Sequence, residues 1–369
     1  MKKISLLLVF VIIICSLTGC GGKKDDEKEI VAEYLPTGMT FSDKNVDFIG
    51  RFKEVDGGYQ FAWSGSSIRA GFVGTEISAT LELVEKYQQT DFLEIIIDGK
   101  EHKTLEIYPK VKRSELLAYD LPYGYHTVEI IKRTEQLSLM AFYGFDYADG
   151  VYPAPAPARS DKRIMFIGES ITSGYGVMRM NGDRGFYSSE QDVQHTYGWL
   201  VAKELGAECD ILGISSAGIV KNPVSNRWNC YGGTMITDPY PTPEEDVPDL
   251  IVINLGTIDN HGKINDREFE KEYRSFINEV RATYPDAAIL CTIGGITNEP
   301  YASIEKVVNK LKAEGMGKLY SYKIIASRDD ENCCGGDFHP NANGHAAMAE
   351  ELVVFIRNNI EFKKNGQKA

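Results

Sequence analysis

Apolar and polar residues alternate through the first half of the chain, over residues 41–149. Between residues 77 and 83, for example, every second residue is apolar. A period of two is typical of strands that bury one face. The apolar run 93–97 ends at Asp98 and Gly99, a pair that favours a hairpin turn. The pattern needs no helix in this half, and it predicts an antiparallel β-sandwich.

Beyond residue 160 the pattern changes to short apolar runs separated by helical stretches. The runs lack strict alternation, as expected of parallel strands buried on both faces. Apolar residues in the helical stretches recur every three or four positions, as in Phe269, Tyr273, Phe276 and Val280. This predicts a three-layer α/β domain over residues 161–362, with its active site at the carboxyl ends of the strands. We expect these strands at 164–168, 210–215, 250–255, 287–293 and 319–326.

A stretch with alternating prolines separates the two patterns. Pro153, Pro155 and Pro157 lie within residues 150–160, and such segments favour extended, semi-rigid connectors over packed structure. We place the domain boundary there. Residues 363–369 follow the last helical pattern and form a C-terminal tail.

The first twenty residues have the pattern of a targeting segment. Two lysines precede an apolar run over residues 4–15, which is too short to span a bilayer comfortably, and small residues lead to Cys20. This resembles a bacterial lipoprotein signal. The resemblance implies that residues 1–19 are removed, that Cys20 receives lipid and that residues 20–40 form a tether. The protein is then expected in the cell envelope, periplasmic or surface-exposed, and in contact with membrane only through its lipid. A secretory signal with an incidental cysteine is the alternative.

Charge and cysteine content narrow the possible partners. Asp and Glu number 53 against 40 Lys and Arg, a net charge of -13, so no basic excess exists to neutralise the phosphates of a nucleic acid. A neutral substrate fits better.

Five cysteines follow Cys20, an odd number that cannot complete a disulfide framework. The pair Cys333 and Cys334 lacks the spacing of a metal site, so we assign none. Loop thiols or one disulfide, with Cys230 as a partner, remain the alternatives.

A serine and a histidine from opposite ends of the second domain are candidates for catalysis. Ser170 follows the first predicted strand, and His339 precedes the last helix, with Asp337 two residues earlier. A histidine base can take the serine proton, and a carboxylate can fix the histidine tautomer. Loops at Gly218 and at residues 256–260 follow the next two strands and could donate backbone N–H groups to an oxyanion. Each feature alone is more often simple turn chemistry.

Together these residues resemble the four sequence blocks of the SGNH (GDSL-type) hydrolases. The blocks are Gly168-Glu169-Ser170, Gly218, Gly256–Asp259 and Asp337–Pro340. The first domain, through Phe61–Ile68, Asp98–Gly99 and His126–Arg133, resembles the N-terminal jelly roll of carbohydrate esterase family two. The resemblance covers nearly the whole chain beyond the tether. It implies a jelly-roll sandwich followed by an SGNH hydrolase domain.

The resemblance also implies roles for individual residues. Ser170 is the nucleophile and His339 the general base, with the backbone N–H groups of Ser170 and Gly218 in the oxyanion hole. Asp337 is the candidate third member. Most SGNH enzymes place this carboxylate three residues before the histidine, whereas a two-residue spacing is familiar in family two, where a serine–histidine pair can suffice. The implied reaction removes acetyl groups from xylan-type or mannan-type polysaccharides or oligosaccharides, with no cofactor or metal.

Two residues depart from the family pattern, and one tryptophan is a candidate for substrate binding. Glu169 stands where aspartate is usual, and Ile258 stands where an asparagine normally donates to the oxyanion. Loss of one such donor lowers turnover about 100- to 1000-fold. Asn260 is the candidate replacement. Trp228, in the polar loop 221–240, could form a platform for a sugar ring, and a tryptophan that covers the core is the alternative.

Two other functions compete with this interpretation. Ile258 also suits a glycan-binding surface lipoprotein that keeps the esterase fold with little or no catalysis. An SGNH esterase or lipase acting on another acyl group is the second possibility. The jelly-roll resemblance and the lack of a long apolar lid disfavour the lipase.

Overall fold

The computed structural model describes residues 45–86, 90–180, 182, 184–225, 227–327 and 332–362. The predicted signal peptide, the predicted lipidation site Cys20, the predicted tether and the C-terminal tail lie outside these ranges. Within them, no helix is both long and apolar enough to cross a membrane.

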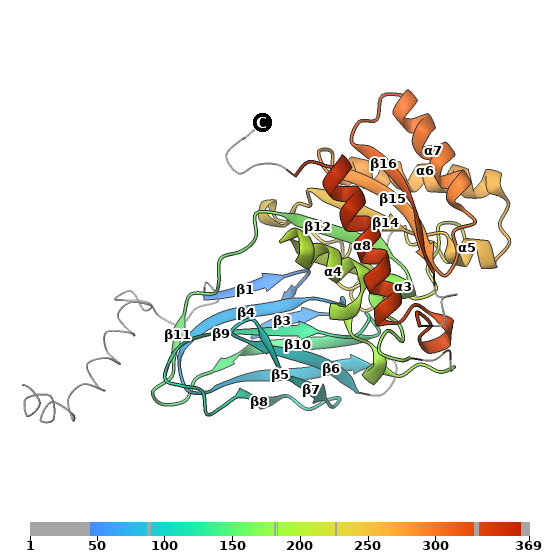
Figure 1. Ribbon diagram of the computed structural model, residues 1–369. Coiled ribbons are helices and arrows are strands. Elements are labelled where there is room, and N and C mark those ends of the chain that lie inside the picture. Colours follow the sequence, from blue (N-terminus) through green and yellow to red (C-terminus); the bar gives the residue numbers. More distant parts are fainter. Residues whose placement is uncertain are drawn as a thin grey trace, which may run out of the picture.

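The first domain is a sandwich of two antiparallel sheets (Figure 1). One sheet has the order β1-β4-β9-β6-β7, with β11 also paired to β4, and the other has the order β2-β3-β10-β5-β8. Apolar side chains from both inner faces fill the space between them, as the alternating sequence pattern predicts. The strands are β1 (Val46–Ile49), β2 (Lys53–Val55), β3 (Gly58–Phe61), β4 (Ser67–Gly74), β5 (Ile77–Lys86), β6 (Asp91–Ile97), β7 (Lys100–Ile107), β8 (Arg113–Ala118), β9 (Gly124–Lys132), β10 (Ser138–Asp146) and β11 (Tyr152–Ala154).

Part of the predicted linker is packed, so the prediction of a plain connector is wrong for β11. This strand pairs with residues 71–73 of β4, whereas β1 pairs with residues 67–70 of the same strand. Ala154 is fully buried. β11 therefore continues the line of β1 along one side of β4. Pro153 is tolerated because an edge strand leaves alternate N–H groups without a partner in the sheet.

The second domain is a parallel sheet of order β13-β12-β14-β15-β16 with helices on both faces. Its strands are β12 (Arg163–Gly168), β13 (Glu208–Gly213), β14 (Leu250–Asn254), β15 (Ala288–Gly295) and β16 (Leu319–Ser327). Its helices are α3 (Ser170–Ser173), α4 (Tyr197–Leu205), α5 (Thr257–His261), α6 (Asp266–Thr283), α7 (Tyr301–Ala313) and α8 (Ala342–Asn359). Short 3-10 turns are η2 (Ser188–Glu190), η3 (Val193–His195), η4 (Glu244–Asp246) and η5 (Gly336–Phe338).

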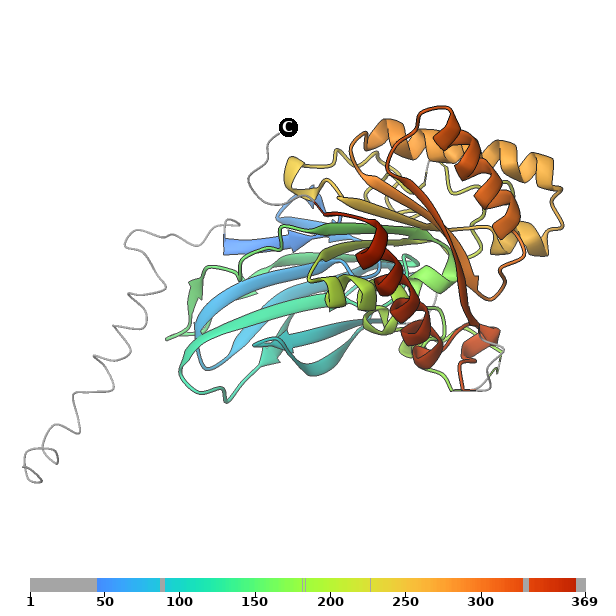
Figure 2. The same ribbon diagram turned by 45° about the horizontal axis from the view of Figure 1, so that its top comes forward.

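Two apolar layers cover the parallel sheet. α6 and α7 pack on one face, where Phe269, Tyr273, Phe276 and Val280 are buried at the predicted helical spacing. α4 and α8 pack on the other face. Figures 1 and 2 show α6 and α7 on the side of the sheet away from the sandwich, and α4 beside it. The predicted fold class is thus confirmed in both halves.

Buried polar contacts join the two domains. Arg51, next to β1, has no exposed surface and donates to the carbonyl oxygens of Trp228 and Cys230 at 2.7 and 2.9 Å. The indole N–H of Trp63 donates to the same Cys230 oxygen at 3.2 Å. These donors form hydrogen bonds with backbone carbonyls of the long β13–β14 connection. The sandwich therefore helps to fix that connection in place.

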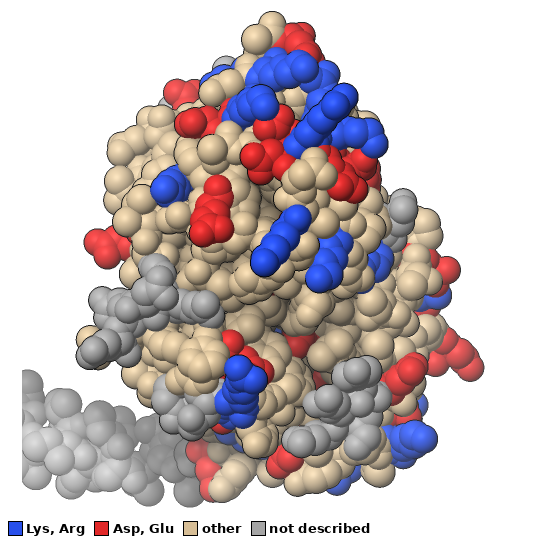
Figure 3. Space-filling model, turned by 90° about the vertical axis from the view of Figure 1, so that its right-hand side faces the viewer, with Lys and Arg blue, Asp and Glu red and all other residues tan. Residues whose placement is uncertain are grey.

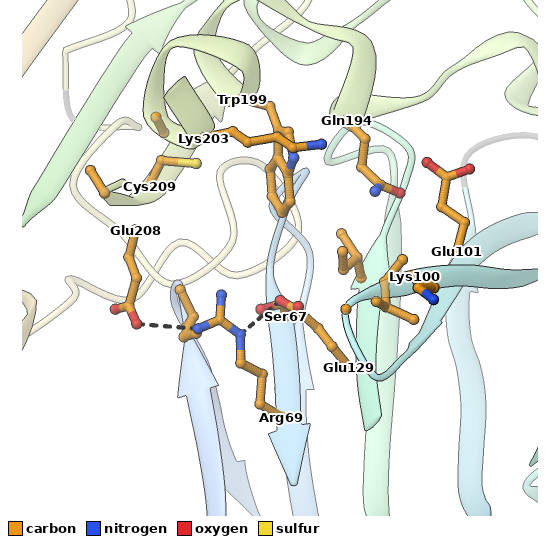
Figure 4. Close-up of a pocket in the computed structure, with 17 residues that line it drawn as sticks. Ser67, Arg69, Lys100, Glu101, Glu129, Gln194, Trp199, Lys203, Glu208 and Cys209 are labelled. Carbon is orange, nitrogen blue, oxygen red and sulfur yellow. Dashed lines mark hydrogen bonds and ion pairs between the residues drawn. The ribbon is translucent and has the colours of Figure 1, made fainter. Parts of the chain in front are cut away.

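A cavity of about 510 Å³ lies between the domains (Figure 4). Arg69 of β4 pairs with Glu129 of β9 and with Glu208 at the amino end of β13. Trp199 of α4 lines the cavity and packs against Gly65, where an added Cβ would lie 3.3 Å from the indole ring. The cavity therefore lies at the amino end of β13, away from the carboxyl edge of the sheet.

Candidate active site

Ser170 is the first residue of α3, directly after β12 and Glu169. Its Oγ lies 2.8 Å from Nε2 of His339 and 2.6 Å from Oε2 of Glu169. Ser170 is 6% exposed and Glu169 is 1% exposed. The structure thus brings the predicted nucleophile and base into hydrogen-bond contact across 169 positions of sequence.

Backbone carbonyls hold the imidazole of His339. Nδ1 lies 3.2 Å from the carbonyl oxygens of both Gly336 and Asp337. Because carbonyl oxygens only accept, Nδ1 carries the proton and Nε2 is free to accept from Ser170. The turn that presents these carbonyls is strained, since Asp337 and Phe338 have φ of 49° and 60°. This tautomer is the one that a general base for Ser170 requires.

The Asp337 carboxylate contacts Tyr175. Oδ2 of Asp337 accepts a hydrogen bond of 2.7 Å from the tyrosine hydroxyl. The Tyr175 ring also lies against the imidazole of His339, with centroids 4.6 Å apart. Asp337 therefore contacts His339 through its backbone carbonyl, and its carboxylate helps to position the ring that packs on His339. Sequence reasoning missed Tyr175, although it lies only five residues after Ser170, between Gly174 and Gly176.

Gly176 lets two loops approach each other closely. Its φ is +61°, and a Cβ there would lie 2.7 Å from Cα of Gly336. The Gly336 N–H also donates to the Gly176 carbonyl at 3.1 Å. The segment after Ser170 is thus packed, backbone against backbone, on the turn that carries His339.

The predicted oxyanion loop is held by an aspartate. Both carboxylate oxygens of Asp259 accept backbone N–H bonds of 2.8–2.9 Å from residues 219–221. The Gly218 N–H donates to the carbonyl of Asn222 at 3.2 Å. The role of Gly218 as an oxyanion donor stays a prediction, and in this structure its N–H already has an acceptor within its own loop.

Asn260 does not direct its amide at Ser170. Its Nδ2 donates to Glu299 at 2.9 Å, on the exposed side of α5. Ile258, two residues earlier on the same helix, is half-buried, and its side chain has no donor group. The proposed replacement of the missing asparagine by Asn260 therefore has no support in the geometry.

The prediction of a sugar platform at Trp228 is wrong. The side chain is fully buried, with the rings of Phe276 and Tyr284 edge-on to it at 6.1 and 6.2 Å. Its indole N–H donates to Glu279 of α6 at 2.5 Å. The polar loop around Trp228 folds it under the surface, so it covers the core. Of the two alternatives left open for the cysteines, the structure shows thiols at Cys230 and Cys334.

A buried glutamate from the sandwich reaches the site, and sequence reasoning missed it. Glu135 follows β9 and is 1% exposed. Its carboxylate accepts hydrogen bonds from Ser173 of α3, from Ser215 of the predicted oxyanion loop and from Gln191. Burial raises its pKa. No sequence pattern marks this residue, because its partners come from three distant segments.

The same fold occurs in known proteins. Residues 48–157 match the family described as carbohydrate esterase 2 N-terminal, and residues 166–347 match the GDSL-like lipase/acylhydrolase family. A family two carbohydrate esterase from Clostridium thermocellum, solved in complex with cellohexaose, aligns with a TM-score of 0.80 and 28% identity, over 85% of this chain and 99% of that chain. The chain belongs to carbohydrate esterase family two.

Curated relatives of this family-two chain agree with the assignment. The chain is 31% identical over 332 residues to the cellulase/esterase CelE of Acetivibrio thermocellus. This alignment covers 84% of this chain and 39% of CelE. The chain is also 26% identical over 329 residues to an acetylxylan esterase / glucomannan deacetylase of Cellvibrio japonicus. This alignment covers 86% of this chain and 89% of that protein. The chain thus spans well under half of CelE and most of the Cellvibrio enzyme.

Proposed function

We propose that this protein is a serine esterase that removes O-acetyl groups from plant cell-wall polysaccharides or oligosaccharides of the xylan or mannan type. The observation that carries the proposal is the 2.8 Å contact between Oγ of Ser170 and Nε2 of His339, in a family-two fold. Two relatives support the substrate class: one is named acetylxylan esterase / glucomannan deacetylase, and another binds cellohexaose.

The geometry suits acyl transfer in two steps. Ser170 attacks the acetyl carbonyl while His339 takes the hydroxyl proton, and His339 then returns the proton to the departing sugar oxygen. A water molecule, activated by the same histidine, attacks the acetyl-serine and releases acetate. The Nδ1 contacts to two carbonyl oxygens stabilise the imidazolium that forms in both steps.

The charge distribution agrees with a neutral substrate. Figure 3 shows Lys and Arg mixed with Asp and Glu at the top of the molecule, in the part that contains α6 and α7. Much of the middle of this face carries neither charge. A polysaccharide has no net charge to be steered by a strong field of one sign, and none is visible on this face.

The lipid anchor at Cys20 is part of the same proposal. An esterase held at the cell envelope would act on glycans that reach the periplasm or the cell surface. We expect the full chain to fractionate with membranes and Cys20→Ala to be released into the soluble fraction. A Cys20→Ala variant that stays with the membranes as fully as the parent chain would contradict the anchor.

Acetate release tests the enzymatic proposal. The intact protein should release acetate from acetylated xylan or acetylated mannan fragments, and Ser170→Ala should not. Glu129→Gln, which alters a carboxylate in the interdomain cavity, serves as a matched control with activity close to that of the parent chain. Equal release by the intact protein and Ser170→Ala would contradict the esterase. Glycan binding without acetate release would support the glycan-binding lipoprotein with little or no catalysis. Hydrolysis of longer acyl esters only would support an SGNH esterase or lipase that acts on another acyl group.

A further inference from the structure

The hydroxyl of Ser170 has two hydrogen-bond contacts and one proton. Oγ lies 2.8 Å from Nε2 of His339 and 2.6 Å from Oε2 of Glu169. Both distances are those of hydrogen bonds, so each contact needs a proton between its two atoms. A second proton must therefore come from the histidine or from the glutamate.

The neutral His339 ring cannot supply this proton, because its single N–H is on Nδ1. Nδ1 faces two carbonyl oxygens, which can only accept, so the neutral ring has its proton on Nδ1 and accepts at Nε2. The serine proton then lies on the line to His339. The remaining contact, between two oxygens, is a hydrogen bond only if the Glu169 carboxyl carries a proton and donates it.

The surroundings of Glu169 favour this protonated form over an ion pair between Glu169 and a doubly protonated His339. Burial raises the pKa of Glu169 to about 7, partly offset by the Ser170 hydroxyl and by the N–H groups of Ser170 and Ile171. Glu135 also raises this pKa. Hydrogen bonds from Ser173, Ser215 and Gln191 partly offset the effect of burial on the pKa of Glu135.

Charged and titratable groups face Glu169 from every neighbouring segment. The loop after β9 contributes Glu135, backed by the buried Lys132, which pairs with Asp91 at 3.0 Å. α4 contributes the buried Tyr197, whose hydroxyl contacts Thr172 at 2.8 Å. The turn before α8 contributes His339 itself. Apart from His339, none of these brings a positive charge into contact with Glu169 among the described residues.

Apart from the backbone N–H of Ser170, the donors predicted for the oxyanion are engaged or missing. The Gly218 N–H donates to Asn222, the Asn260 amide donates to Glu299, and Ile258 has no donor. The Glu169 carboxyl is already beside Oγ, and the oxyanion forms on the carbon that becomes bonded to this same oxygen.

We propose that Glu169 is a catalytic residue that acts in its protonated form, as a hydrogen-bond donor to Oγ of Ser170 and then to the oxyanion, in place of the donor that Ile258 lacks. During attack the serine proton passes to Nε2, the new C–O bond forms, and the carbonyl electron pair moves to its oxygen. The Glu169 proton stays on the carboxyl throughout and turns toward the negative oxygen. The inference rests on the proposed esterase function.

Kinetics with a chromogenic acetyl ester test the donor. In the parent enzyme kcat/KM should fall as the pH rises through about 7, because ionised Glu169 competes for the serine proton and repels the oxyanion. Glu169→Gln keeps a neutral donor, so this alkaline limb should vanish while most of the activity at pH about 6 is retained. Glu169→Ala should lose about 100- to 1000-fold. Glu129→Gln should keep the parent profile.

A second substitution separates a donor from a structural role. Ile258→Asn supplies an amide, so it should restore at least about tenfold of the activity lost in Glu169→Ala, a larger gain than it gives in the parent enzyme. An identical gain in both backgrounds would overturn the inference. So would a Glu169→Gln variant that is as inactive as Glu169→Ala at every pH, because an ionised carboxylate would then be required.

Infrared spectroscopy tests protonation without any substrate. At pH about 6 the parent enzyme should show the C=O stretch of a protonated carboxyl that is missing from Glu169→Gln and present in Glu129→Gln. Absence of this band overturns the inference whatever the activity. The band without hydrolysis of any acetyl ester supports the protonated glutamate and contradicts the proposed function.

Discussion

Asp337 acts on two neighbours through two different groups. Its carbonyl oxygen lies 3.2 Å from Nδ1 of His339, and its carboxylate accepts from Tyr175 at 2.7 Å. We expect Asp337→Asn to lower kcat/KM about tenfold or less, because the carbonyl contacts to the imidazole remain. Removing the acid of a chymotrypsin-type triad lowers kcat about 10⁴-fold. Steady-state kinetics on an acetyl ester measure the effect, and a loss near the triad value would assign the carboxylate the role of the third member.

Gly176 is a second residue with a measurable role. A Cβ at this position would lie 2.7 Å from Cα of Gly336. The φ of Gly176 is also +61°, a conformation that residues with a side chain rarely adopt. Gly176→Ala should displace the turn that carries His339 and lower turnover about 100-fold, within the range that general base catalysis contributes. Gly206→Ala is the matched control, since its φ is +64° and a Cβ there has open space. Equal turnover in the two variants would show that the close approach does not position the base.

Candidate site residues could be predicted where a motif and a strand end coincide. Ser170 and His339 follow from the position of Ser170 after a buried strand and of His339 before the last helix. The depth of Trp228 could not be predicted, because it depends on Phe276 and Glu279 of a helix some fifty positions away. Tyr175 and Glu135 were missed because hydrogen-bond partners distant in sequence define them.

Among the elements, α3 and the loop after β13 are held by one side chain from the other domain. Glu135 accepts from Ser173 of α3 and from Ser215 of the loop. Glu135→Ala should lower kcat about tenfold or more with a smaller change in KM, because it leaves the buried partners of the carboxyl unsatisfied, at a cost of about 1–3 kcal/mol. Glu135→Gln should recover part of the loss, and thermal unfolding of both variants checks that the domains remain folded. A change confined to KM would argue against positioning of the nucleophile and its loop.

The elements themselves followed closely from the sequence. The five apolar runs became β12 to β16 with shifts of a few residues at their ends, because parallel strands buried on both faces need continuous apolar runs. The helix over Phe269–Val280 followed from its apolar spacing. β11 could not be predicted, since its pairing with β4 depends on the end of β1 and not on its own proline-rich sequence.

At the scale of the whole molecule, the sandwich helps to hold the segments that form the candidate active site. It supplies Arg51 and Trp63 to the long β13–β14 connection and Glu135 to the nucleophile helix. The sequence indicated two domains and their order, and the polar contacts between them became visible only in three dimensions. Buried ion pairs and hydrogen bonds of this kind fix one relative placement, because an unpaired partner would be left in the interior.

Covalent labelling of the nucleophile tests the central claim most directly. The protein is treated with a phosphonate ester that reacts with activated serines, and the adduct is located by peptide mass spectrometry. The account predicts one adduct per chain, on Ser170, absent from Ser170→Ala and formed about 100-fold or more slowly in His339→Ala. An adduct on another serine, or an unchanged labelling rate in His339→Ala, would contradict the Ser170–His339 pair.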